Sequence, residues 1–182
     1  HSHIDHLLGL IKWASDNDIK KVAIHIITDG RDTPAKSASK YLNQIESCIK
    51  KFNTGEIASI CGRYWMMDRN LLWDRTEKAY ANLTDPNIKI NNISPKDYIK
   101  ESYDKNITDE FIEPIRMSEN YLKDGDSLIC FNFRPDRARQ IIKSLSDKQF
   151  SDFKRKIFPT VDLVTFTQYD TSLPVKVAFP PE

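Results

Sequence analysis

The sequence has 182 residues, of which 40% are hydrophobic and 29% charged, and 27 basic against 26 acidic side chains leave a formal net charge of +1. A chain of this length and composition is expected to fold as one globular domain spanning residues 1–182. The balanced charge argues against a protein that binds nucleic acid through excess basic charge. No apolar run approaches the roughly 20 residues of a membrane span, so we expect neither nucleic acid nor a membrane among its partners.

The hydrophobic periodicity predicts alternating helices and strands. In chain order the pattern favours a helix over 4–14, a strand over 22–27, a helix over 35–52, a strand over 56–61, helices over 73–83 and 95–104, a strand over 127–133, a helix over 136–145 and strands over 161–166 and 175–179. The stretch 111–115 is strand-like but contains Pro114, which favours a sheet edge. This alternation predicts an α/β fold with a central, mostly parallel or mixed sheet flanked by helices in three layers.

The three cysteines Cys48, Cys61 and Cys130 are widely spaced and contain no C-x-x-C pair. Their odd number and spacing favour neither a disulfide framework nor a zinc site. We expect free, mostly buried thiols and a reducing cytoplasm as the location. No signal-peptide pattern is recognisable, and because the first residue is His1 rather than methionine, the natural N-terminus is expected to lie upstream.

The loop Asp29-Gly30-Arg31-Asp32 follows the buried strand over 22–27 and precedes a predicted helix. In α/β proteins, ligands bind at the carboxyl ends of strands, in loops that lead into helices. The loop therefore has the position of a binding loop. A surface turn with a local ion pair is the alternative explanation.

Arginines also follow two other predicted strands. Arg63 follows the strand over 56–61, with Arg69 six positions later, and Arg134 and Arg137 follow the strand over 127–133. If these strands run parallel to the strand before Arg31, their carboxyl ends bring the guanidinium groups to one edge of the sheet. Arginine suits bidentate binding of carboxylate and phosphate, so the pattern predicts a pocket for a small molecule with several negative charges.

The alternative is that each arginine pairs with the aspartate next to it in the sequence. The local pairs would be Arg31 with Asp32, Arg69 with Asp68, and Arg137 with Asp136. In that case the arginines serve only to hold the surface of a scaffold domain.

The histidines do not suggest a metal site. His3 and His6 lie three positions apart at the start of a predicted helix, but no third ligand is evident beside this pair, so we expect no metal site in this chain. His25, inside a predicted strand, is expected to be a core or half-buried residue with a satisfied hydrogen bond.

Several motifs together resemble one family. The motifs, in order, are HSHIDHL at 1–7, DGRDT at 29–33, GRYWMMDR at 62–69, DEFIEP at 109–114, NFRPDRAR at 132–139 and VAFP at 177–180. They resemble the substrate-binding (phosphotransferase) domain of the cofactor-independent, that is 2,3-bisphosphoglycerate-independent, phosphoglycerate mutases. The resemblance extends over essentially the whole chain.

The resemblance implies an isomerase that interconverts 3-phosphoglycerate and 2-phosphoglycerate in glycolysis and gluconeogenesis, without a bisphosphoglycerate cofactor. The family has a second, alkaline-phosphatase-like domain, which carries two manganese ions and a serine that accepts the phosphoryl group. The domain seen here would hold the glycerate while it is reoriented and rephosphorylated.

The resemblance also implies substrate contacts for seven residues of this chain. They are His1, Arg31, Asp32, Arg63, Arg69, Arg134 and Arg137. The arginines would hold the carboxylate and phosphate of the substrate. Asp32 would accept a hydrogen bond from a glycerate hydroxyl or assist proton transfer.

The chain departs from the family pattern in several respects. The strand and Gly-rich turn expected before His1, the nucleophilic serine, the metal-binding Asp and His clusters and a lysine from beyond the domain boundary are missing, and Pro135 stands where a small residue is usual. We therefore expect a fragment that does not catalyse the mutase reaction by itself. A non-catalytic module that binds small anions is the other functional hypothesis.

Overall fold

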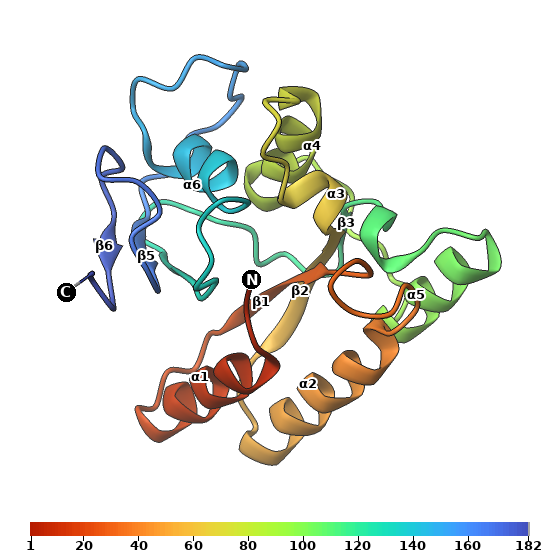
Figure 1. Ribbon diagram of the computed structural model, residues 1–182. Coiled ribbons are helices and arrows are strands. Elements are labelled where there is room, and N and C mark those ends of the chain that lie inside the picture. Colours follow the sequence, from red (N-terminus) through yellow and green to blue (C-terminus); the bar gives the residue numbers. More distant parts are fainter. Residues whose placement is uncertain (182) are drawn as a thin grey trace.

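The computed structural model describes residues 1–181, and its chain alternates helices and strands (Figure 1). The elements are α1 (Ile4–Asp16), β1 (Ala23–Thr28), α2 (Ala38–Phe52), β2 (Glu56–Gly62), α3 (Arg63–Met66), α4 (Trp73–Thr84), α5 (Pro95–Asp104), the 3-10 turn η1 (Asp109–Phe111), β3 (Ile115–Arg116), β4 (Ser127–Cys130), α6 (Arg139–Ser146), β5 (Asp162–Thr165) and β6 (Lys176–Val177). The helices and strands expected from periodicity are present, with ends that differ by a few residues.

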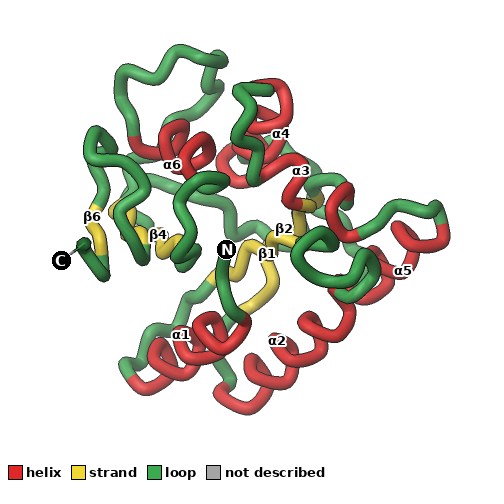
Figure 2. Tube along the Cα trace, in the orientation of Figure 1, coloured by secondary structure: helices red, strands yellow, loops and turns green. Residues whose placement is uncertain are grey.

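The strands form two three-stranded sheets rather than one continuous central sheet. In the first sheet β1 pairs parallel with β2 and β3 pairs antiparallel with β2, whereas β4, β5 and β6 are all parallel. Figure 2 shows the two groups of strands with the N-terminus between them. The backbone N–H of Phe133 donates to the carbonyl of His1 at 2.9 Å, so the first residue connects to the segment that follows β4.

The two faces of β2 pack into different parts of the core, because successive side chains of a strand point to opposite faces. Ile60 belongs to an apolar cluster with Leu42 of α2 and Ile99 of α5. The next residue, Cys61, belongs to a second cluster that includes Tyr80 of α4 and Ile141 of α6. Helices therefore cover both faces of the strands, and the α/β class with its three layers is confirmed.

Two element ends differ from the sequence prediction for reasons visible in the structure. β4 ends at Cys130 rather than at Phe133, because the N–H of Phe133 turns away from the sheet ladder to the His1 carbonyl. The predicted strand over 111–115 is wrong except at its last residue: Asp109–Phe111 form the turn η1, and the edge strand is Ile115–Arg116, after the proline.

The first turn of α2 is capped by a side chain that lies far away in the sequence. The Asp109 carboxylate, 1% exposed, accepts hydrogen bonds from the backbone N–H groups of Ser37 at 2.8 Å and Ala38 at 2.9 Å, and from the Tyr103 hydroxyl. The predicted start of this helix, at residue 35, was too early. Residues 33–37 form the turn that brings the helix N-terminus to Asp109.

Residues 109–112 also cover the carboxyl ends of β1 and β2. Thr28 donates its hydroxyl hydrogen to the carbonyl of Asp109 at 2.7 Å, and the Gly62 N–H donates to the carbonyl of Ile112 at 2.7 Å. Gly30 has a φ of 68°, and a Cβ there would lie 2.8 Å from both the Asp109 Cβ and the Glu110 nitrogen. The loop after β1 can therefore pass under this segment only with glycine at position 30.

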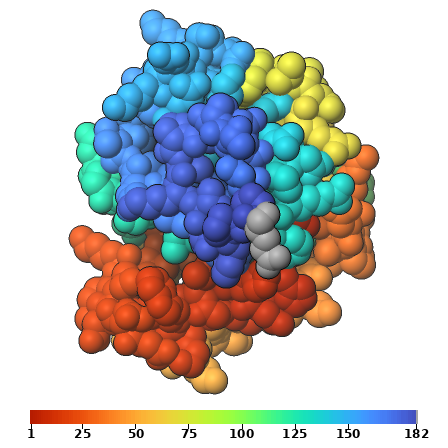
Figure 3. All heavy atoms as spheres, turned by 60° about the vertical axis from the view of Figure 1, so that its left-hand side comes forward, coloured from red at the N-terminus to blue at the C-terminus, as the bar shows by residue number. Residues whose placement is uncertain are grey.

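The two ends of the chain approach each other on one face of the molecule. Figure 3 shows the blue C-terminal part lying against the red N-terminal part. The rings of Phe133 and Phe166 pack against His6 of α1, with centroids 5.8 and 5.6 Å away.

No helix in the described part of the chain is long and apolar enough to cross a membrane. The thiols of Cys48, Cys61 and Cys130 are free, and the first two are buried, as expected.

Replacing Asp109 by alanine should destabilise the fold strongly. The substitution removes the acceptor of two helix N-terminal N–H groups and of a buried hydroxyl, so we expect a loss of about 2 kcal/mol or more. Urea unfolding of the chain followed by circular dichroism measures it. Asp104→Ala, which removes an exposed aspartate from α5, is the matched control and should leave the urea midpoint nearly unchanged. Equal midpoints for the two variants would contradict the capping role of Asp109.

Gly30→Ala and Gly125→Ala separate backbone strain from steric contact. Both glycines have positive φ, 68° and 87°, but no atom lies within 4 Å of a Cβ at position 125. Both variants should lose about 1 kcal/mol from the left-handed backbone. Gly30→Ala should lose about 1–3 kcal/mol more, because the new methyl group meets the backbone of residues 109–110. Equal losses in thermal or urea unfolding would show that the contact is unimportant.

Candidate functional site

The loop after β1 forms a tight turn that presents two charged side chains. The Asp29 carboxylate Oδ1 accepts the backbone N–H groups of Arg31 and Asp32, each at 3.1 Å. The N–H of Gly30 donates to the hydroxyl of Thr33 at 3.2 Å. Such aspartate turns hold the backbone locally, so the side chains of Arg31 and Asp32 leave the turn in defined directions.

Arg63 joins this turn to the neighbouring strand. It is the first residue after β2, and Thr28 pairs with Gly62 at the parallel ends of β1 and β2. Its Nη1 donates to Asp29 Oδ1 at 2.7 Å and to Asp32 Oδ2 at 2.8 Å, and its side chain is 4% exposed. The hydrogen bond from Arg63 lowers the pKa of Asp32 below its ordinary value of 3.8.

Asp136 organises a second group of charges beyond β4. Its Oδ2 accepts a hydrogen bond from Arg69 Nη1 at 2.5 Å, and its Oδ1 lies 3.3 Å from Arg134 Nε. Arg137, the next residue, donates from Nη1 to the carbonyl of Met67 at 3.2 Å. The segments before α4 and before α6 are therefore held together by arginine side chains.

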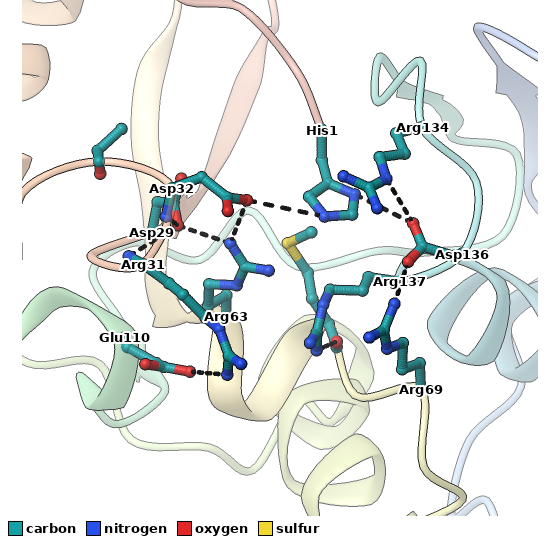
Figure 4. A network of polar contacts seen from close by, with 12 residues as sticks. His1, Asp29, Arg31, Asp32, Arg63, Arg69, Glu110, Arg134, Asp136 and Arg137 are labelled. Carbon is teal, nitrogen blue, oxygen red and sulfur yellow. Dashed lines mark hydrogen bonds and ion pairs between the residues drawn. The ribbon is translucent and has the colours of Figure 1, made fainter.

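His1 lies between the two groups, as Figure 4 shows. Its Nε2 is 3.9 Å from Asp32 Oδ2 and its Nδ1 is 3.5 Å from Asp136 Oδ1, and its side chain is 7% exposed. The carbonyl of the same residue accepts the N–H groups of Phe133 and Arg134. The imidazole therefore connects a loop of the first sheet with a loop of the second.

All the candidate residues predicted from the sequence lie in this one place. They are His1, Arg31, Asp32, Arg63, Arg69, Arg134 and Arg137 (Figure 4). Their roles in binding stay predictions, but the convergence of loops that follow β1, β2 and β4 agrees with the reasoning from strand ends.

The alternative of local ion pairs is wrong for the pairs that were proposed. Arg31 contacts Glu110, 79 positions away, and Arg69 contacts Asp136, 67 positions away. Asp32 pairs with Arg63 rather than with Arg31. Sequence reasoning did not assign Asp29, Glu110 or Asp136 to the site, because contacts between such distant positions leave no local signal.

Three buried polar atoms of the site lack a hydrogen-bond partner. Within the described residues there are four such side-chain atoms: His1 Nδ1, Arg63 Nε, Asp136 Oδ1 and, outside the site, Asn82 Oδ1. Folded proteins leave few buried polar groups unsatisfied, and those that remain call for an explanation such as a binding role. Two of the three, His1 Nδ1 and Asp136 Oδ1, lie 3.5 Å apart in ion-pair contact without forming a hydrogen bond. The unsatisfied atoms are thus concentrated at the site.

Two other features do not belong to a ligand site. His25 is half-buried, and its Nδ1 lies 2.7 Å from the Ser59 hydroxyl, as expected of a half-buried residue with a satisfied hydrogen bond. Burial lowers the pKa of this imidazole to about 4. A cavity of about 330 Å³ lies beside β3, but the guanidinium of Arg116 in its wall is hydrogen-bonded to the backbone carbonyls of Asn82 and Asp85. The Arg116 guanidinium therefore binds carbonyl groups at the C-terminal end of α4.

Replacing Arg63 by methionine should raise the pKa of Asp32, because the hydrogen bond that lowers it is lost. Carboxyl-carbon NMR titration measures this pKa. Arg75→Met, which removes an arginine near Asp68 instead, is the control and should leave the pKa of Asp32 in place.

The same pair predicts a pH dependence of stability. Because the folded-state pKa of Asp32 is lowered, its contribution is fully present above the ordinary value of 3.8 and is lost as the pH falls through the lowered value. The difference in melting temperature between the wild type and Arg63→Met should therefore shrink below about pH 4. A constant difference from pH 7 to pH 2 would contradict the assignment.

Comparisons with known proteins agree on one family. The family model described as "BPG-independent PGAM N-terminus" matches residues 1–171. A 2,3-bisphosphoglycerate-independent phosphoglycerate mutase of Prochlorococcus marinus subsp. pastoris is 75% identical over all 182 residues, and one of Picosynechococcus sp. is 48% identical over the same span. The chain spans about a third, 34%, of the length of these relatives.

A solved structure of Leishmania mexicana phosphoglycerate mutase has the same fold. It superposes with a TM-score of 0.91 at 26% sequence identity, covering 100% of this chain and 36% of the other. The matched region includes every element and all the loops that form the site. The chain therefore belongs to the family of the BPG-independent PGAM N-terminus, found in the 2,3-bisphosphoglycerate-independent phosphoglycerate mutases.

Proposed function

We propose that this chain is the substrate-binding part of an enzyme that interconverts 3-phosphoglycerate and 2-phosphoglycerate. The observation that carries the proposal is the convergence of five arginines from three loops, in a place where three buried side-chain atoms lack a hydrogen-bond partner. The family membership supports this function over that of a module binding small anions without catalysis. The pathway would be glycolysis and gluconeogenesis, and the location the cytoplasm.

The charges of the site favour an anion. Arg137 has no carboxylate within salt-bridge distance among the described residues. Burial lowers its pKa, and the positive charges of Arg63, Arg69 and Arg31 lower it further. An anionic ligand among these groups would relieve the repulsion, which is strongest where water is excluded.

The degree of exposure suggests different tasks for the arginines. The side chains of Arg31, Arg69 and Arg134 are 59%, 46% and 61% exposed, and each keeps donors available for a carboxylate or phosphate. Arg63 is buried and holds Asp32 in place. Asp32, 54% exposed, would accept a hydrogen bond from a glycerate hydroxyl or take part in proton transfer.

The phosphoryl transfer would need groups outside this chain. No group of three His, Cys, Asp or Glu side chains within residues 1–181 is arranged to hold a metal ion. The two manganese ions and the serine nucleophile implied by the resemblance would therefore belong to the alkaline-phosphatase-like domain in the rest of the protein. The metals would supply positive charge to the transferring phosphoryl group, and bisphosphoglycerate would not be required.

Arg134→Ala in the full-length protein should weaken substrate use. A charge-assisted hydrogen bond contributes about 1.5–3 kcal/mol, so kcat/KM for 3-phosphoglycerate should fall by about tenfold to a hundredfold. A coupled assay for 2-phosphoglycerate measures the rate, and the rise in melting temperature that 3-phosphoglycerate gives the wild type should shrink in the variant.

Lys154→Ala removes one exposed positive charge far from the site and is the control for net charge. It should behave as the wild type in both measurements. A wild-type protein without mutase activity, or an Arg134→Ala variant indistinguishable from Lys154→Ala, would refute the proposed function.

A further inference from the structure

The loop that carries Arg69 contains a strained residue. Leu71 has a φ of 60°, in the left-handed region that non-glycine residues rarely adopt, and its side chain is 65% exposed. Burial of the side chain therefore does not offset the strain. Such a conformation persists only where the surrounding structure enforces it, and strained positions cluster at functional sites.

Two buried side chains enforce this conformation. Asp68 Oδ2 accepts the backbone N–H groups of Asn70 at 3.0 Å and Leu72 at 2.9 Å. Gln140 Oε1 accepts the N–H of Leu71, between them, at 2.9 Å. Three consecutive N–H groups of the loop are thus held by side chains.

The two side chains also bind each other. Gln140 Nε2 donates to Asp68 Oδ2 at 3.0 Å and to the Thr76 hydroxyl of α4 at 3.1 Å. Asp68, Gln140 and Thr76 are 2%, 6% and 0% exposed. The other carboxylate oxygen, Asp68 Oδ1, lies 3.6 Å from Arg75 Nη1. A buried carboxylate is tolerated when it is paired and hydrogen-bonded, and here its hydrogen bonds go to the backbone of the loop and to Gln140.

The Asp68–Gln140 contact is adjacent in the sequence or through hydrogen bonds to two arginines of the site. Arg69 is the residue between Asp68 and Asn70, and it reaches Asp136 at 2.5 Å. Arg137 lies three positions before Gln140 and donates to the carbonyl of Met67, the residue before Asp68. The Asp68–Gln140 contact therefore links the loop that carries Arg69 to the segment that carries Arg137.

We propose that Asp68 and Gln140 are positioning residues of the substrate site, which hold Arg69 and Arg137 at the separation that a phosphoglycerate requires. Neither side chain reaches the ligand itself, since both are buried behind the loop. The proposal rests on the proposed function, because it concerns the same arginines.

The test is Gln140→Met in the full-length enzyme, which conserves volume and removes all three hydrogen bonds of the amide. Residues in one network couple by amounts that correspond to roughly tenfold in an equilibrium constant. KM for 3-phosphoglycerate should therefore rise by about tenfold. In the background of Arg69→Ala, Gln140→Met should raise KM by a smaller factor than it does in the wild type, because one of the two arginines that it positions is gone.

Leu145→Ala, on the same helix, is the control for stability. Its side chain is buried in the apolar core cluster and takes no part in the hydrogen bonds that hold the loop and Asp68. It should lower the melting temperature and leave KM unchanged. A Gln140→Met variant that loses melting temperature with unchanged KM, or whose effect on KM is the same with and without Arg69, would overturn the proposal.

Asp68→Asn provides a second measurement if Gln140→Met does not fold. It weakens the acceptor for Asn70 and Leu72 and should give the same rise in KM, which should be smaller in the Arg69→Ala background. An unchanged KM would overturn the proposal. If Arg69→Ala by itself leaves KM and kcat unaltered in an active wild type, the role of Arg69 in the proposed function fails. If Arg69→Ala behaves as expected and both positioning variants do not, only this inference fails.

Discussion

The arrangement of the site depends on one buried guanidinium group placed between two carboxylates. Arg63, 4% exposed, donates to Asp29 and Asp32 from a position directly after the neighbouring strand. A buried charge is tolerated only when it is paired and hydrogen-bonded, so the loop after β1 and the end of β2 must keep their register. Arg63 thereby holds the Asp32 carboxylate in its ionised form as a hydrogen-bond acceptor, and part of the Asp32 side chain remains exposed to solvent.

The site joins two sheets that share no ladder hydrogen bonds in the described chain. Arg63 and Asp32 belong to the β1–β2 side, Arg134 and Asp136 to the β4 side, and His1 contacts both aspartates. A ligand with negative charges at both ends would add a further connection between the two sides. Binding and the mutual position of the sheets are therefore expected to depend on each other.

Side chains distant in the sequence hold both halves of the site from behind. Asp109 caps α2 and lies over the loop that carries Arg31, while Asp68 and Gln140 hold the loop that carries Arg69. In both places a buried carboxylate accepts backbone N–H groups of a loop that could not hold its shape alone. The precision of the charged groups thus comes from hydrogen bonds in the layer beneath them.

The sequence by itself determined the α/β class, most of the helices and strands, and the arginines of the candidate site, because periodicity and strand-end loops are local patterns that single stretches display. His1 and Asp32 were assigned to the site through the family resemblance. The tertiary structure decided the rest. The division into two sheets, the turn at Asp109–Phe111 and the true partners of the arginines depend on contacts between residues up to 81 positions apart. Neighbouring Asp and Arg residues in the sequence suggested local pairs, but a turn such as that at Asp29 directs adjacent side chains apart. Arg31, Arg63 and Arg69 therefore pair with carboxylates on other segments, whereas Arg134 pairs with Asp136 two positions away.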